Sequence, residues 1–416
     1  MPGSTPESGS PRGHGFGTSP VFLASVSTIL GAIMFLRFGY AVGNTGLLGA
    51  LLIIVLGHMV TVPTALAIAE IATNRRVEGG GEYFIISRSF GVTIGGAIGI
   101  SLFLSQAISV AFYMIAFAEA FSPLGGWFQQ LTGMGWDPRF ISLPAVVGLS
   151  ALVITRGANI GVQALWVVVG ILGLSLLLFF LGSPVDAPLD GLQVESQVQS
   201  VSLFSGLSDP DPFILVFAIV FPGFTGMTAG VGLSGDLANP RRSIPLGVLS
   251  ATVTGMVIYV ALVVKLAVSA PPELLDSDQL VMSRIALWGP IIPIGLAAAT
   301  LSSAIGSILV APRTLQALGG DKIFPAKGAN PFLSQGVGDS NEPRNATLIT
   351  AAIAVITVAL GNVDMVARIV SMFFMVTYGA LCAISFLEHF AARPSYRPSF
   401  RSKWYLSFWG AVLCLL

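Results

Sequence analysis

The stretch FPGFTGMTAG, residues 221–230, lies inside an uncharged run that extends from Phe213 to Gly235. A run of this length can cross a bilayer as a single helix. Within ten residues, however, the stretch contains Pro222 and three glycines. Pro removes a backbone donor, and each Gly costs about 1 kcal/mol relative to Ala in a helix interior. We therefore predict a transmembrane helix that is broken near its middle.

The composition of the chain indicates a membrane protein. Of its 416 residues, 54% are hydrophobic and only 10% are charged, and the mean hydropathy is +0.84. A soluble protein carries about 25% charged residues. Apolar runs long enough to cross roughly 30 Å of hydrocarbon recur along the chain. We predict an eleventh, incomplete span beginning near Trp404, after ten spans at residues 21–43, 46–70, 94–121, 140–155, 160–182, 213–235, 245–270, 285–317, 345–361 and 364–390.

The distribution of charge predicts the orientation in the membrane. Fifteen of the 20 Lys and Arg residues lie on the same side as the N-terminus, whereas the opposite loops contain acids such as Asp186 and Glu273. The positive-inside rule therefore predicts a cytoplasmic N-terminus, in a multi-pass protein of the plasma membrane. Formal net charge is zero, which gives no indication of a nucleic-acid partner. Cys382 and Cys414 lie in apolar segments and indicate neither a disulfide framework nor a metal site. No cofactor is expected.

The chain divides into a tail, a core and a C-terminal segment. Residues 1–19 are rich in Gly, Pro and Ser and predict a disordered cytoplasmic tail. Residues 20–390 form the predicted ten-span core, and residues 391–416 a cytoplasmic loop with the start of the eleventh span.

The break in the sixth predicted span has a counterpart in the first span. The segment STILGAIMFLR, residues 27–37, has Gly31 at mid-membrane depth, and Gly31 precedes Gly226 by 195 residues and five spans. Interrupted helices at matching positions of two halves indicate a transporter with an inverted repeat, here about 20–182 and 213–390. Half-helix ends of opposite polarity attract cations and anions through their dipoles. The alternative is a helix-packing face, because the spacing of Gly226 and Gly230 is also typical of close helix contacts.

Several long motifs resemble those of the cation-chloride cotransporters. They are IATN (71–74), GGGEYFIISRSFG (79–91), FPGFTGMTAGVGLSGDLANPRRSIPLG (221–247), ATLSSAIGSILVAPRTLQAL (299–318) and RPSFRSKWYLSFWGAVLC (397–414). The resemblance extends from about residue 17 to the end of the chain. It implies an all-α fold of the amino acid–polyamine–organocation superfamily, with a leucine-transporter-type 5+5 inverted repeat and discontinuous spans 1 and 6. It also implies alternating-access, electroneutral transport of chloride with sodium, potassium or both.

The resemblance further implies three kinds of ion site. For potassium, the matching residues are Thr28, Ile29, Tyr113, Pro222 and Thr225. Thr28 departs from the Asn of the family, and its shorter side chain puts potassium selectivity in question. For sodium, they are Ser27, Leu30, Ala299, Ser302 and Ser303. For chloride, they are the amides of Gly31, Ala32 and Ile33, and a second group of Gly226, Met227, Thr228 and Tyr378. The breaks would thus expose backbone amides to a bound anion.

Two charges within the predicted spans predict an outer gate. Arg37 lies seven residues beyond Leu30, about 10 Å, and Glu119 lies six residues beyond Tyr113, about 9 Å. Both therefore reach the same height above the predicted ion sites. We expect an Arg37–Glu119 pair that closes when the site faces inward, although a permanent structural ion pair would have the same sequence pattern. Glu70, at the inner end of the second span, has no role that the sequence explains.

Other classes of function fit the sequence less well. A membrane-embedded enzyme would need paired catalytic groups, and a channel would show a repeated pore loop or an acidic ring. The pattern GVGLSG, residues 230–235, follows no strand and does not indicate dinucleotide binding. The remaining alternatives are a sodium-chloride cotransporter without potassium and an amino-acid permease of the same superfamily. The expected partners are small inorganic ions and the lipid bilayer, and the resemblance implies a homodimer in the full-length protein.

Overall fold

The structure is a computed structural model that describes residues 17–74, 82–156, 162–185, 203–338, 341–391 and 396–415. Most of the predicted tail, residues 1–16, lies outside these described residues. The described part is almost wholly helical, and it contains no strand but includes an isolated β-bridge between Val337 and Glu342. This agrees with the all-α prediction.

The predicted spans correspond to helices of the structure within a few residues. Seven helical segments of the described chain are long and apolar enough to cross a membrane, and α7, α8, α15 and α17 are shorter apolar helices. The α-helices are α1 (Thr18–Ile29), α2 (Ala32–Leu36), α3 (Phe38–Asn74), α4 (Glu82–Phe90), α5 (Val92–Glu119), α6 (Gly125–Thr132), α7 (Arg139–Arg156), α8 (Val162–Phe180), α9 (Phe213–Val220), α10 (Pro240–Ala267), α11 (Pro272–Ser277), α12 (Val281–Ile285), α13 (Ile291–Gly320), α14 (Ala329–Ser334), α15 (Arg344–Leu360), α16 (Val363–Ala391) and α17 (Trp404–Leu413). The 3₁₀ helices are η1 (Ser122–Leu124), η2 (Phe221–Phe224) and η3 (Met227–Asp236).

Gly46 divides α3 into the end of the first span and the whole of the second. Its φ of 67° is left-handed, a conformation that glycine adopts without steric cost. A Cβ at this position would stand 2.4 Å from the carbonyl carbon of Phe204. The tight turn therefore needs glycine both for its backbone conformation and for the close approach of the 203–205 segment.

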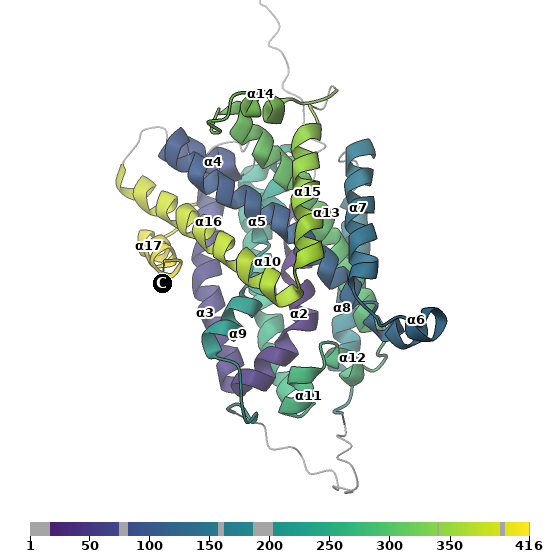
Figure 1. Ribbon diagram of the computed structural model, residues 1–416. Helices are drawn as coiled ribbons and strands as arrows, with labels where there is room; N and C mark the ends of the chain where they lie inside the picture. Colours follow the sequence, from purple (N-terminus) through teal and green to yellow (C-terminus); the bar gives the residue numbers. More distant parts are fainter. Residues whose placement is uncertain are drawn as a thin grey trace, which may run out of the picture.

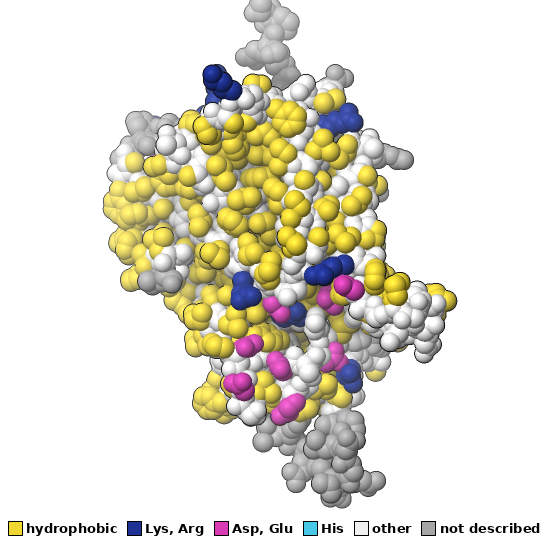
Figure 2. Space-filling model, in the orientation of Figure 1, with side chains coloured by type: hydrophobic (Ala, Val, Ile, Leu, Met, Phe, Trp, Pro, Cys, Tyr) yellow, Lys and Arg dark blue, Asp and Glu magenta, His cyan; other side chains and the backbone are white. Residues whose placement is uncertain are grey.

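The helices form an elongated bundle, with α14 at one end and α11 at the other (Figure 1). Within it α3 packs on α10, α5 on α13, and α1 on α10. We call the two ends of this bundle the α14 end and the α11 end. Figure 2 shows a broad hydrophobic band between them, and Asp and Glu side chains gathered toward the α11 end. Exposed apolar side chains such as Val167, Ile214 and Met372 contribute to the apolar surface. Such a surface suits lipid, because it would be costly in water.

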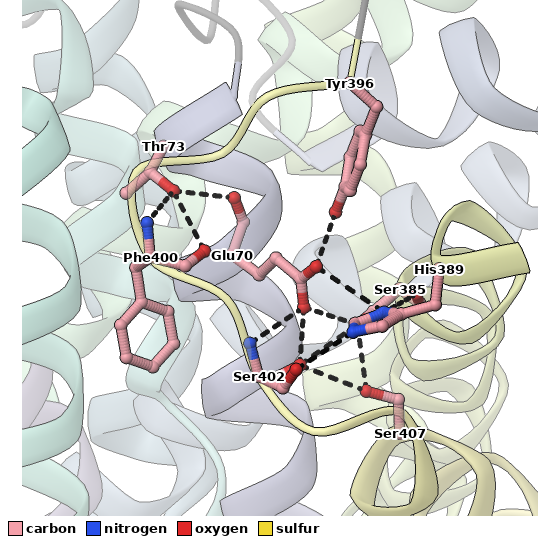
Figure 3. Close-up of polar contacts among 8 residues, drawn as sticks. All are labelled: Glu70, Thr73, Ser385, His389, Tyr396, Phe400, Ser402 and Ser407. Atoms are coloured by element: carbon pink, nitrogen blue, oxygen red, sulfur yellow. Dashed lines mark hydrogen bonds and ion pairs between the residues drawn. The ribbon is translucent and has the colours of Figure 1, made fainter. Parts of the chain in front are cut away.

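Glu70 has a structural role that the sequence did not reveal. Its side chain is fully buried near the end of α3 and is surrounded by donors (Figure 3). The Tyr396 hydroxyl donates to Oε1 at 3.1 Å, and Oε2 accepts from the Ser385 hydroxyl at 3.0 Å. Oε2 also accepts from Ser402, through its backbone N–H at 3.2 Å and its hydroxyl at 2.5 Å. One carboxyl group thereby joins α3, α16 and the 396–403 segment that leads into α17, and the hydrogen bonds offset the cost of burying it.

Candidate functional site

The first span is broken between α1 and α2. Leu30 ends α1 with its N–H bonded to the Val26 carbonyl at 2.9 Å, and the helix resumes at Ala32. Gly31 lies between the two helices, where a Cβ would stand 2.8 Å from the Thr28 carbonyl oxygen. The break leaves the carbonyls that end α1 and the amides that begin α2 without the usual helical partners.

The sixth span is broken at the quoted stretch. Helix α9 passes into the 3₁₀ helix η2, Thr225 is extended with a ψ of −179°, and Gly226 is left-handed with a φ of 104°. Helix η3 then begins at Met227. Pro222 and Gly226 thus lie on the two sides of one break, which agrees with the predicted interruption. The first amides of η3, those of Met227 and Thr228, have no partner within that helix.

The two breaks are in contact with each other. A Cβ on Gly226 would stand 2.6 Å from Thr28 Cγ2. One turn earlier, the Ser25 hydroxyl donates to the Met227 carbonyl at 3.1 Å. Segments about two hundred residues apart in sequence therefore meet at one point, where the polar backbone of both is buried.

Tyr259 of α10 holds both breaks together. Its hydroxyl is within hydrogen-bonding distance of the Ile29 carbonyl and, at 2.7 Å, of the Gly223 carbonyl. The ring is fully buried and stacks on Phe38 at a centroid distance of 4.6 Å. This residue was missed in the sequence, where it is one tyrosine in an ordinary apolar span and carries no distinguishing signal.

The five residues predicted for potassium gather around this contact. Thr28 Oγ1 donates to the Ala24 carbonyl at 2.9 Å, and Thr225 Oγ1 donates to the Pro222 carbonyl at 2.7 Å. Ile29 offers its carbonyl to Tyr259, as described above. Tyr113 of α5 is buried and lies within electrostatic range of Tyr259. Both hydroxyls of the threonines are therefore engaged with their own helices here.

The residues predicted for sodium lie on α1 and α13, which pack against each other. Ser27 Oγ donates to the Ala24 carbonyl at 3.1 Å, and Leu30 forms the end of α1. Ala299 is fully buried and Ser302 is half-buried. Ser303 is buried, and its hydroxyl has no hydrogen-bond partner among the described residues. A buried hydroxyl without a partner is costly and requires an explanation.

The residues predicted for chloride form two groups. Gly31, Ala32 and Ile33 lie at the break and the start of α2, and the Ile33 side chain lies where a Cβ on Gly223 would stand. The second group combines Gly226, Met227 and Thr228 of the sixth span with Tyr378 of α16. The Tyr378 hydroxyl lies near the Gly226 backbone and the Thr225 side chain. It is fully buried and makes no well-formed hydrogen bond with a described residue.

The ion pair of Arg37 differs from the prediction. Arg37 is 7% exposed, and its Nε donates to Oδ1 of Asp364 at 2.5 Å. Its Nη1 donates to the Leu36 carbonyl at 2.9 Å and to Gln279 Oε1 at 3.1 Å. Glu119 lies within electrostatic range of Arg37, but the salt bridge is with Asp364 at the start of α16. In this structure Arg37 is therefore paired with Asp364, and the Arg37–Glu119 gate stays a prediction. The prediction compared only the heights of Arg37 and Glu119 along their own spans. It could not show that α16 places the carboxylate of Asp364 closer to Arg37.

Taken together, the geometry defines a class of protein: a helical membrane transporter with two broken spans that meet at a buried polar site. The amino acid permease family model matches residues 21–413. The chain therefore belongs to the amino acid permease family, and the resemblance to the cation-chloride cotransporters is confirmed by relatives from solute carrier family 12.

Individual relatives and one solved structure support this assignment. The chain is 32% identical to solute carrier family 12 member 2 of Squalus acanthias, over 95% of this chain and 36% of that protein. It is 30% identical to solute carrier family 12 member 9 of Mus musculus, over 95% of this chain and 47% of that protein. The chain thus spans less than half the length of these relatives. The structure of MhsT in complex with L-phenylalanine matches with a TM-score of 0.61 at 16% identity, over 97% of this chain and 98% of that one. This likeness confirms the leucine-transporter-type fold.

Proposed function

We propose that this protein is a sodium-coupled cation-chloride cotransporter that works by alternating access, electroneutrally, with potassium as the second cation. The observation that carries the proposal is the Ser303 hydroxyl, which is buried on α13, a helix packed against α1, without a partner among the described residues. A sodium ion prefers oxygen ligands and would satisfy it. Ser27, Leu30, Ala299 and Ser302 are the other proposed sodium ligands.

The proposed anion sites use the amides at the two breaks. Gly31, Ala32 and Ile33 serve one, and Gly226, Met227, Thr228 and Tyr378 serve the other. The unpartnered Tyr378 hydroxyl supports the second site in the same way that Ser303 supports the sodium site. A phenol donates to an anion, and a helix start attracts negative charge.

The potassium site is proposed at Thr28, Ile29, Tyr113, Pro222 and Thr225. Here a specific observation favours an alternative without potassium: the hydroxyls of Thr28 and Thr225 both donate to carbonyls of their own helices. Potassium binding would require at least one of them to turn away from that carbonyl, since a hydroxyl coordinates a cation through its oxygen lone pairs.

An amino-acid permease is the remaining rival. The family model bears that name, and MhsT was solved with L-phenylalanine. The direct contact between Gly226 and Thr28 supports the ion proposal, because it brings the two breaks to van der Waals distance.

The proposal also includes the membrane, the orientation and the oligomeric state of the protein. We place the ten-span core, residues 20–390, in the plasma membrane with the N-terminus and the α14 end in the cytoplasm. The full-length protein is proposed to form a homodimer.

Uptake into proteoliposomes tests the proposal. Sodium-22 and rubidium-86 uptake would be measured with chloride present or replaced by gluconate, with rubidium standing in for potassium. Chloride-dependent uptake of both ions, each requiring the other, is the expected result. Chloride-dependent sodium uptake that is the same with and without rubidium would establish the alternative without potassium. Sodium uptake that does not depend on chloride, together with sodium-driven amino-acid uptake, would overturn the proposal in favour of a permease.

A further inference from the structure

Glu82 is an acidic side chain at an unusual position. It is the first residue of α4, a helix that connects the second and third spans, and it is only 8% exposed. Glutamate is rarely buried to this extent unless it is paired. The side chain of Thr228 in η3 lies close to its carboxyl group and interacts with it. It also lies within electrostatic range of Tyr378 in α16.

These two neighbours are both members of the second proposed chloride group. Thr228 follows Gly226 and Met227 in the sixth span, and the Tyr378 hydroxyl is the buried, unpartnered group described above. An acidic side chain therefore borders a site that we propose for an anion. An ionised carboxylate there would repel chloride, whereas a protonated carboxyl group would not.

The charges on the elements packed against α4 do not neutralise Glu82. Arg88, on α4 itself, lies 3.9 Å from Asp321, which also accepts a hydrogen bond from the Tyr83 hydroxyl at 2.8 Å. Arg313 of α13 lies 3.6 Å from Glu342.

The two remaining helices packed against α4 are α5 and α16, and they contribute the phenol groups of Tyr113 and Tyr378. Both Tyr113 of α5 and Glu82 lie within electrostatic range of Tyr378 of α16. Farther along α16, His389 lies 3.6 Å from Glu70 in the network of Figure 3. Among the described residues, the influences on the Glu82 carboxyl are thus burial and the Thr228 hydroxyl.

Burial raises the pKa of Glu82 from its ordinary 4.5 to about 7, and the interaction with Thr228 opposes the rise. The carboxyl group therefore changes its protonation state near neutral pH. Because coupling between two sites is reciprocal, an anion that binds better beside the protonated form must itself favour protonation.

We propose that Glu82 is a proton-binding site coupled to the anion site of η3 and Tyr378, so that chloride binds there together with one proton. The proton adds to a carboxylate oxygen, and no other bond changes. This inference rests on the proposed function, because it requires the anion site. It extends that function by making the proton a further co-bound ion.

Isothermal titration of the purified protein with sodium chloride, against sodium gluconate as the blank, tests the proposal. The titration would be repeated at pH 6.0, 7.0, 8.0 and 8.5 in buffers of different ionisation enthalpy, which report the protons taken up per chloride. Wild-type protein should take up a proton at pH 8.0. Its chloride affinity should fall by up to tenfold per pH unit above pH 7.

Three variants test whether the proton effect belongs to Glu82 or to the protein in general. Glu82→Gln, which is neutral at every pH, should bind chloride without proton uptake and without pH dependence, near the wild-type affinity at pH 6.0. Glu342→Gln removes an acid at the α14 end that is not on the anion site, and it should behave as wild type. Glu82→Asp should retain proton uptake.

The outcomes distinguish this inference from the proposed function. Chloride binding by wild type that is independent of pH and takes up no proton would overturn the role of Glu82 and leave the anion site standing. Absence of chloride binding at every pH would overturn both. The wild-type measurement needs no variant, so a Glu82→Gln protein that fails to fold would not prevent the decision.

Discussion

The backbone of Gly226 lies directly against the side chain of Thr28, so that a Cβ on Gly226 would stand 2.6 Å from Thr28 Cγ2 and 2.9 Å from Thr28 Cβ. This contact joins the broken sixth span to the broken first span. Because Gly226 is also left-handed, with a φ of 104°, the position has both a steric and a conformational requirement for glycine.

Gly226→Ala should therefore disable transport. The left-handed backbone costs roughly 1–2 kcal/mol for a non-glycine residue, and the new methyl group would press on Thr28. We expect at least a tenfold loss of chloride-dependent sodium uptake and a lower melting temperature. Gly306→Ala in α13 is the matched control, because nothing lies within 4 Å of a Cβ there. Equal uptake by the two variants would contradict the proposed importance of the contact.

Ser303→Ala should weaken sodium dependence without unfolding the protein. The hydroxyl makes no hydrogen bond with a described residue, so its removal leaves no protein group unpaired. We expect the KM for sodium to rise about tenfold, and thermal stability without sodium to stay the same or increase. Ser307→Ala, one helical turn further along α13 and also buried, is the control. A sodium KM that is unchanged in Ser303→Ala would remove Ser303 from the site.

Asp364→Asn should change the rate of transport more than the stability. Arg37 is almost buried, but the Asp364 side chain is 41% exposed, so water can replace part of the lost interaction. If the pair acts as an outer gate, stopped-flow measurements should show a severalfold change in uptake rate with little change in sodium KM. The exposed pair of Arg139 and Asp137 offers the control Asp137→Asn. A rate equal to wild type would indicate a purely structural ion pair.

Tyr396→Phe should loosen the attachment of the 396–403 segment to α3. The variant removes one donor to Glu70 and leaves those from Ser385 and Ser402. The expected loss is about 1 kcal/mol of unfolding free energy, the usual net value of one hydrogen bond. Glu70→Ala should cost more, since three hydroxyls, those of Tyr396, Ser385 and Ser402, would lose their acceptor. Chemical denaturation measures both, with Tyr405→Phe on the half-exposed Tyr405 as the control. Equal stabilities would argue against the network.

The free energy of unfolding should depend on pH through the protonation of Glu82. Its pKa in the folded protein is raised to about 7 from 4.5, so the folded state binds more protons between these values. Stability should therefore decrease as pH rises from about 4.5 to about 7 and then level off. The change due to this group is about 3 kcal/mol. Comparison of wild type with Glu82→Gln isolates it, and identical pH profiles would contradict the assignment.

The spans and their breaks could be predicted because their causes are local. Hydrophobic length defines a span, and Pro and Gly weaken a helix wherever they occur. For this reason the interruptions at Gly31 and Gly226 were predictable, as was the division between the first two spans near Gly46. The helix α4 was missed as a helix, because at nine residues it is too short to be a span and it follows a run of three glycines.

Features that depend on contacts between distant spans could not be predicted in the same way. Tyr259 lies in unremarkable local sequence, and the motif that contains Glu82 does not show that this acid is buried, because the importance of each residue comes from its contacts with other helices. The partner of Arg37 was predicted as Glu119 from helical rise alone, whereas packing of α16 brought Asp364 closer. Glu70 remained unexplained until the 396–403 segment was seen to surround it.

The position of the Tyr259 hydroxyl has a consequence for the ions. The oxygen lies within reach of two carbonyls, one from each broken span, at Ile29 and Gly223. A phenol carries a single hydrogen and can serve only one of them at a time. The other carbonyl then keeps both lone pairs unclaimed by this residue. Rotation about the C–O bond of Tyr259 thus decides which of the two broken spans keeps a carbonyl oxygen free of this hydroxyl.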